Sequence, residues 1–381
     1  MVCALTATNH IIIERRKERN NAMEKQNGRQ SNFELLRVIC MISIVSIHLY
    51  KQTDAVRLEL EDGAPYFFIL FLGYGGRLVC NCFVMIGAWF LCDARFKADR
   101  IVKLWLYVFS YTTIITITCT LLNIQGGGII LLVQSFLPVM GRPVWFAAEY
   151  LCMLMLSPFL NMLLEHSRIV CYKLLIIFGG LIITCATLFP IEHTTPAFSE
   201  LVWFCFLYMF VAYFKKYPCL WMENKSICVI GAILGYLICV LCYVVLREFG
   251  FDSLAEYYNT HYENALSFIT SVFLFYAFKN INIGNVRMIN VVSESTFAVY
   301  VIHQTPCFYP TLWNGIFSVD EYVGKQSFII YVLYVIFLIF IVSVVVEHIR
   351  KSFFERFIYK SRLYKGVCVY IGRFYDFIGE K

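Results

Sequence analysis

The sequence predicts an all-α membrane protein, a bundle of about ten transmembrane helices with both termini in the cytoplasm. Of the 381 residues, 60% are hydrophobic and only 15% are charged, and the mean hydropathy is +0.68. Aromatic residues are abundant, with 35 Phe and 25 Tyr. The apolar residues also gather in runs that approach the roughly 20 residues needed to cross a bilayer. A soluble domain would need a more charged surface.

Ten apolar runs are long enough, or nearly so, to be transmembrane helices. They cover residues 33–50, 68–92, 101–122, 144–164, 171–189, 200–214, 226–246, 263–279, 289–309 and 327–346. The run at 129–139 is short and contains Pro138, so we interpret it as a re-entrant or surface segment of an outer loop.

The distribution of basic residues supports this topology. The formal net charge is +6, which could suggest a nucleic-acid partner. The Lys and Arg residues are not gathered in one basic patch, however, but recur between the apolar runs, and this dispersal argues against such a partner. If the N-terminus is cytoplasmic, few of the 32 basic residues fall in outer segments, namely Lys51, Arg57, Arg77, Arg142, Arg247 and Lys325. The excess on the inner side is the positive-inside pattern, so the charges favour an even number of spans.

Three parts follow from this map. Residues 1–30 are expected to be either a disordered cytoplasmic tail or an incorrectly assigned start, because Met23 begins a second plausible N-terminus. Residues 31–350 form one membrane domain, and residues 351–381 form a basic cytoplasmic tail. The 16 cysteines lie mostly inside apolar runs, where Cys behaves as a small hydrophobic residue. The one C-x-x-C, Cys239 to Cys242, has no neighbouring His, so no metal site is predicted.

Ionisable residues inside the spans are few, and such residues are costly in lipid and usually functional. The deepest are Glu34, Arg37, His48, Glu149, Glu294 and His303. Arg37 and His48 are eleven residues apart, which is three helical turns plus about 20°, so they share one helix face about 16 Å apart. Glu34 can pair with Arg37 on that face, although Arg37 alone could also extend to the inner interface.

Three of these groups are expected at one depth in the outer half of the bundle. Counted along their spans, His48, Glu149 and His303 lie at a similar level. Two imidazoles and a carboxylate could provide a general base, His48, with Glu149 as its orienting partner and His303 as a second catalytic group. The alternative is three unrelated polar contacts between helices.

The inner side carries a separate basic cluster at the start of the third span. The sequence DARFKADRIVKLW places Arg95, Lys97, Arg100 and Lys103 together. Their charges could simply fix the topology. They could equally bind a phosphorylated cytoplasmic ligand, because guanidinium groups bind phosphates through two hydrogen bonds.

Several segments resemble the integral-membrane acyltransferase family 3. NFELLRVICMISIVSIHLY resembles the family's first helix, with its R-x10-H pattern at Arg37 and His48. VWFAAEYLCMLMLSPFLN is similar to its tryptophan-led fourth helix, and SESTFAVYVIHQ to its Tyr-x-x-His motif at Tyr300 and His303. NCFVMIGAWFL and ADRIVKLWLYVFSY resemble the second and third helices. The similarity extends over roughly residues 30–350.

The resemblance implies a ten-helix enzyme of the bacterial plasma membrane that acylates hydroxyls of polysaccharide or lipid-linked glycan. Acetyl-CoA or another acyl-CoA would be the donor substrate, with no bound cofactor. Arg37 and Arg100 would then contact the donor, and Lys97 replaces the first arginine of the family's R-x-x-R pattern. The sequence leaves open whether His48 acts as a base or forms an acyl-histidine. A glycan flippase or transporter, and a polysaccharide polymerase, are the alternative functions.

Overall fold

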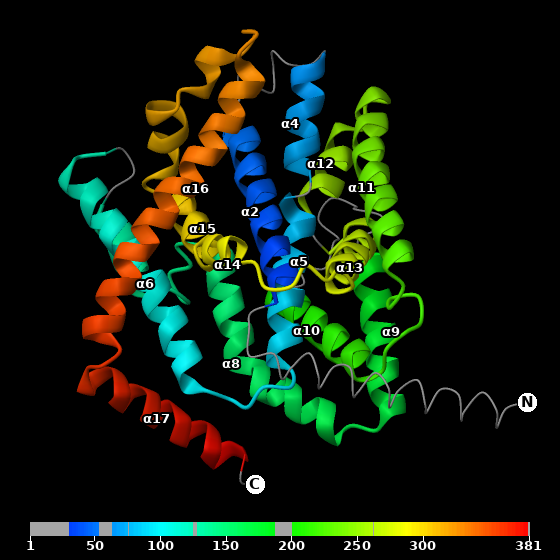
Figure 1. Cartoon of the computed structure of the whole chain (residues 1–381), viewed down its shortest axis with the longest axis vertical. Helices are drawn as coiled ribbons and strands as arrows, with labels where there is room; N and C mark the ends of the chain where they lie inside the picture. The colour runs from blue at the N-terminus through cyan, green and yellow to red at the C-terminus, as the bar shows by residue number, and fades with distance from the viewer. Residues whose placement is uncertain are drawn as a thin grey trace, which may run out of the picture.

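The computed structural model describes residues 30–52, 63–74, 76–124, 128–186, 200–261 and 263–379, and this part of the chain is helical without a strand. Its helices are packed as a bundle (Figure 1). In order they are α2 (Ser31–Gln52), α4 (Ala64–Tyr74), α5 (Gly76–Leu91), α6 (Ala98–Leu121), α7 (Ile129–Phe136), α8 (Trp145–His166), α9 (Ile169–Ala186), α10 (Glu200–Lys216), α11 (Lys225–Glu248), α12 (Asp252–Thr260), α13 (Ala265–Lys279), α14 (Arg287–Glu294), α15 (Thr296–Gln304) and α16 (Phe328–Phe353). A π-helical turn, Phe354–Ile358, then leads to α17 (Arg362–Gly379). The expectations for residues 1–29, including the start at Met23, lie outside the described residues.

The predicted apolar runs all contain helix, but not always a single continuous one. The run at 68–92 contains parts of two helices, α4 and α5, and the run at 289–309 contains α14 and α15. Within the described ranges, five helices are long and apolar enough to cross a membrane: α2, α6, α8, α11 and the α16 segment. The all-helical membrane fold is therefore confirmed, whereas the count of ten spans and the position of the termini stay predictions.

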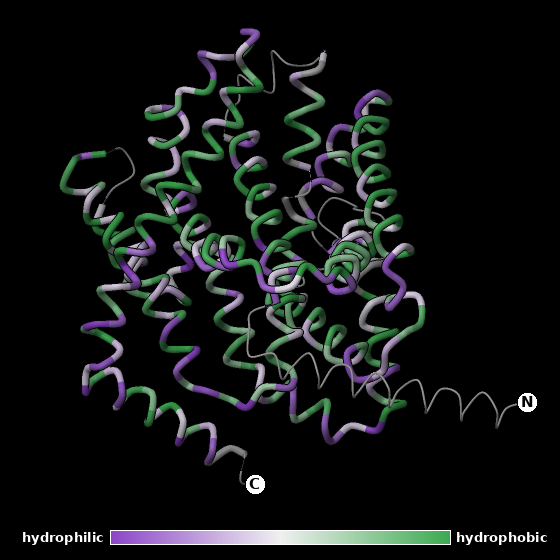
Figure 2. Tube along the Cα trace, in the orientation of Figure 1, coloured by the Kyte–Doolittle hydropathy of each residue, from purple (hydrophilic) through white to green (hydrophobic). Residues whose placement is uncertain are grey.

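The surface of the long helices is apolar, as lipid contact requires. On α16, Ile330, Phe337 and Ile349 are each more than 60% exposed. On α11, the exposed side chains include Ile230 and Leu241. Figure 2 shows hydrophobic residues along α11 and α16 and more hydrophilic ones in α12 and α17. An apolar surface of this extent would aggregate in water, so these faces are the ones in contact with lipid.

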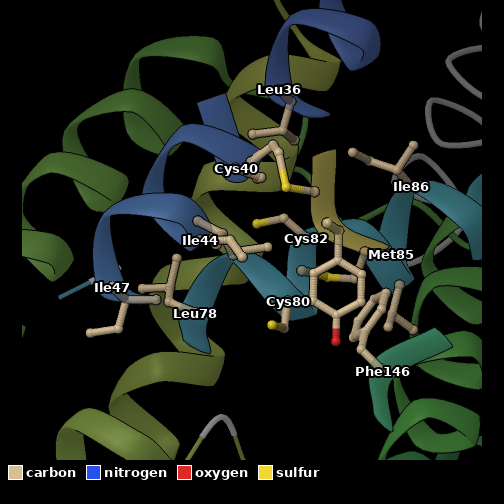
Figure 3. Close-up of a cluster of buried hydrophobic side chains, with 14 of the residues drawn as sticks. Leu36, Cys40, Ile44, Ile47, Leu78, Cys80, Cys82, Met85, Ile86 and Phe146 are labelled. Carbon is tan, nitrogen blue, oxygen red and sulfur yellow. The ribbon is translucent and has the colours of Figure 1, made fainter. Parts of the chain in front are cut away.

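The core of the bundle is centred on α2 and α5. Leu36, Cys40 and Ile44 on α2 are buried against Cys82 and Met85 on α5 (Figure 3). Cysteine side chains are small, so the backbones of α2 and α5 can approach each other closely. Larger aliphatic side chains at these positions would hold the two helices further apart. This close pair fixes the axis of α2, the helix that carries Arg37 and His48.

Helices α11 and α13 pack closely through a small-residue motif. Gly231 and Gly235 on α11 are four residues apart and face Phe273 and Thr270 on α13. A methyl group at either glycine would overlap these side chains. This is the G-x-x-x-G arrangement by which membrane helices approach without a hydrophobic driving force between them.

The end of the chain folds back against the bundle. In Figure 1, α16 runs along the molecule and α17 lies across its lower edge. The Tyr364 hydroxyl donates a hydrogen bond to Asp99 of α6, and the Tyr375 hydroxyl donates to the Met155 carbonyl of α8 at 2.8 Å. Burial, together with the Asp99 carboxylate, raises the pKa of Tyr364 well above its usual value, so its hydroxyl stays a donor. The predicted basic tail is thus a packed helix through residue 379.

Candidate active site

Two histidines meet between α2 and α15. The Nδ1 atom of His48 lies 2.8 Å from Nε2 of His303, and the ring centroids are 5.1 Å apart. His303 is fully buried, and His48 is half-buried near the end of α2. The structure therefore brings together two groups that are 255 residues apart in sequence and that the depth argument placed at one level.

The hydrogen bonds fix which nitrogen of each ring carries the proton. His303 Nδ1 is bonded to the carbonyl oxygen of Val299, and because a carbonyl only accepts, this nitrogen is the N–H donor. The lone pair of neutral His303 is then on Nε2, which accepts the Nδ1–H of His48. The basic lone pair of His48 is consequently on its Nε2. A histidine that acts as a general base through Nε2 needs this tautomer, in which Nδ1–H is held by a hydrogen-bond partner.

Glu149 does not take the expected place beside the imidazoles. The Oε1 atom of Glu149 is 2.9 Å from Nη2 of Arg142. The same Nη2 atom lies 3.6 Å from Oε2 of Glu200. Among the described residues Glu149 makes no hydrogen bond to His48 or His303. The expectation that Glu149 orients His48 is therefore corrected. Glu149 is ion-paired with the guanidinium of Arg142, and the group beside His48 Nδ1 is Nε2 of His303.

Two neighbouring cavities, of about 350 and 530 Å³, share Arg100 as a lining residue, and the larger one lies toward the other end of α2. The larger, the inner cavity, is 530 Å³ and is lined by Glu34 and Arg37 of α2, by Arg100 and Lys103 of α6, and by residues near the end of α16. Arg37 is three turns below His48 along α2, or about 16 Å. His48 and His303 do not line this cavity.

The charges in the inner cavity are mostly paired. Arg37 Nη1 lies 3.2 Å from both oxygens of Glu34, as predicted, and Glu34 also accepts a hydrogen bond from Ser293. Arg350 binds both oxygens of Glu347 at 2.7 Å. In the described part of the chain, Arg100 makes no ion pair, so its guanidinium is available to an anion.

Lys97 and Arg95 line the smaller pocket, of 350 Å³, and Arg100 lines both pockets. Much of the rest of the smaller pocket's wall comes from the second half of α8, including Pro158 and Asn161. The predicted cradle is therefore divided. Arg37 and Arg100 face one cavity, and Lys97 reaches only the neighbouring pocket that shares Arg100.

Aromatic rings connect the inner cavity to the histidine pair. Phe146 lines the cavity, its ring centroid is 5.7 Å from that of Tyr300, and the Tyr300 ring is 6.1 Å from the His303 ring. The break between α14 and α15 at Ser295 lets this helix turn inside the bundle, as discontinuous helices do at membrane binding sites. Gly87 on α5 makes room for the hydroxyl of Tyr150, another cavity residue.

Some cavity residues were not anticipated from the sequence. Glu347, Arg350, Lys351 and Tyr359 were assigned to the end of the last span and the tail, yet they line the inner cavity. The sequence EHIRK, with a carboxylate three residues before Arg350, was an available signal for a buried pair, because those residues share one helix face. Glu294 was noted as a deep charge, and the structure pairs it with Lys351 at 2.7 Å.

Comparison with known families gives one match. A family model described as an acyltransferase domain matches residues 30–348, which is most of the chain. Searches of curated proteins and of solved structures gave no match. The matched region contains both histidines, Arg37 and Arg100, whereas Arg350 and Tyr359 follow it.

Proposed function

The chain belongs to this acyltransferase family, and we propose that it is a membrane O-acyltransferase acting on a surface or exported polysaccharide. The donor is acyl-CoA from the cytoplasm, with acetyl as the acyl group, and the acceptor is a glycan hydroxyl. The observation that carries the proposal is the histidine pair, because its hydrogen bonds leave the basic lone pair of His48 on Nε2.

In this proposal His48 is the general base. The acceptor hydroxyl attacks the thioester carbonyl, and Nε2 of His48 takes the hydroxyl proton as the new ester C–O bond forms. The C–S bond then breaks, and the proton on His48 passes to the departing CoA thiolate, so the thiol leaves. General-base catalysis of this kind contributes about 10²–10⁴-fold in rate. Nε2 of His303 accepts the hydrogen bond from Nδ1–H of His48, and this bond stabilises the imidazolium that His48 forms when it takes the proton.

The donor binds on the cytoplasmic side in the proposed orientation. Arg100 and Arg37 in the inner cavity contact its phosphates, and the thioester arm extends past Phe146 and Tyr300 toward the imidazoles. The acceptor reaches His48 from the opposite face of the membrane. The positive-inside distribution of Lys and Arg supports this assignment of faces.

The test uses purified protein in proteoliposomes with acetyl-CoA and the polysaccharide of the host cell. Release of CoA thiol that depends on the glycan, together with acetyl on the glycan, is the expected result. A glycan flippase or transporter would release no thiol, and a polymerase would lengthen the glycan without acylating it. Acetyl label on the protein after incubation with donor alone would replace the base mechanism by an acyl-histidine.

A further inference from the structure

The wall of the inner cavity includes a segment outside the family match. The match ends at residue 348, and four residues just after it line the cavity, namely Arg350, Lys351, Glu355 and Tyr359. Such a segment can carry a property that the family domain does not by itself provide.

The fold holds this segment in a defined position. The chain leaves α16 through a π-helical turn in which the Tyr359 N–H donates to the Phe354 carbonyl at 3.0 Å. Turns of this type occur often at functional sites. Beyond it, Tyr364 is bonded to Asp99, and the Tyr375 ring lies 4.1 Å from the Phe96 ring, centroid to centroid. These contacts hold α17, which directly follows Tyr359, against α6 and the residues before it.

The surroundings of Tyr359 combine an aromatic face with cations. The Nζ atom of Lys103 lies 5.1 Å from the centroid of the Tyr359 ring, and Arg100 lines the same cavity. The Tyr364 ring is tilted against the Tyr359 ring, with 5.1 Å between their centroids. Bases of nucleotides stack on aromatic rings of this kind, and adjacent Lys and Arg bind their phosphates.

The ion pairs show which cations can serve an anion here. Arg350 is held by Glu347 with both side chains nearly buried, so its charge is used in the fold. Lys103 pairs with Asp99 at 2.9 Å, but both side chains are about half exposed. Such an exposed pair is weak and can exchange its partner. Lys103 beside the Tyr359 ring and Arg100 in the same cavity are therefore two cations of α6 that an anion can reach.

We propose that Tyr359, together with Lys103 and Arg100, forms a subsite for the adenine nucleotide end of the acyl-CoA donor. The base stacks on Tyr359, and the phosphates bind Lys103 and Arg100. This inference rests on the proposed function for its donor. In this proposal Tyr359, which lies beyond the family match, helps to determine which donor is used. It favours thioesters that carry the adenine nucleotide over thioesters that lack it.

The test measures binding of adenosine 3′,5′-bisphosphate to the purified full-length protein by calorimetry. Tyr359→Ala should raise the dissociation constant about tenfold or more, because base stacking contributes on that scale. Tyr359→Phe keeps the ring and should bind like the wild type. Phe357→Ala is the matched control, because Phe357 is exposed in the same turn and does not line the cavity.

Kinetics with two donors complete the test. Tyr359→Ala should raise the KM for acetyl-CoA about tenfold and leave that for acetyl-pantetheine, which lacks the nucleotide, unchanged. Unchanged nucleotide binding in Tyr359→Ala, or an equal loss with both donors, would overturn the subsite while leaving the proposed function standing. Nucleotide binding through Tyr359 without any acyl transfer by the wild type would keep the subsite and overturn the proposed function.

Discussion

Replacement of His303 tests the hydrogen bond that fixes the tautomer of His48. In the resting site a neutral acceptor, His303 Nε2, faces the Nδ1–H of His48 at 2.8 Å. When His48 takes the proton, that bond becomes charge-assisted. Bonds to charged groups contribute roughly 1–1.5 kcal/mol more than neutral ones, which is about tenfold in rate. Loss of the preferred tautomer adds to this, so His303→Ala should lower kcat by about 10- to 100-fold.

The assay follows acceptor-dependent thiol release from acetyl-CoA by the purified variants. His303→Gln, whose amide oxygen can accept from His48, should recover part of the loss. Because His303 is fully buried, thermal unfolding of each variant must first show that the fold is retained. An unchanged kcat in His303→Ala would refute the role of the pair. A loss as complete as that of His48→Ala would mean that His303 itself contacts the reacting atoms.

The other predictions concern the donor side and the topology. Arg100→Ala should raise the KM for acetyl-CoA about tenfold with little change in kcat, because one charge-assisted contact to phosphate is lost. A rise in the KM for the glycan acceptor alone would contradict this. Gly87→Ala should displace Tyr150 and weaken donor binding. Gly87→Ala with Tyr150→Phe should recover part of the loss, because the closest overlap, with the hydroxyl, is then gone while the ring carbons stay in tight contact; no recovery would refute this packing. Reporters fused after residues 98, 220 and 284 should be cytoplasmic, and those after 60, 193 and 255 extracytoplasmic; a reversed pair would mean that one helix hairpin was miscounted.

The sequence was sufficient for the coarse fold because that part depends on local composition. Runs of about 20 apolar residues have few alternatives to a membrane helix. The break at Ser295 was not predicted, although four polar residues, SEST at 293–296, mark its position, because residues 289–309 were interpreted as one continuous span. The packing of α17 was missed for a related reason. Its charges indicated a tail, whereas Tyr364 and Tyr375 make the contacts that hold it.

The candidate site was predictable where one helix determined the geometry. The spacing of Glu34 and Arg37 specifies their ion pair, and the spacing of Arg37 and His48 specifies their common face. The meeting of His48 with His303 followed from depth alone. Depth failed for Glu149, because it gives the level of a residue in the membrane but not the direction of its side chain. A competing cation, Arg142, lies in the loop before α8 and takes the carboxylate.

Mass spectrometry of the glycan shows whether His48 is the base of an acyl transfer to it. Polysaccharide is compared from cells that carry the wild-type gene and from cells that carry His48→Ala at equal membrane levels of folded protein. The wild-type glycan is expected to carry acetyl groups, and the variant's glycan is expected to lack them. Near-normal acetylation with His48→Ala would contradict the role of His48 as the base.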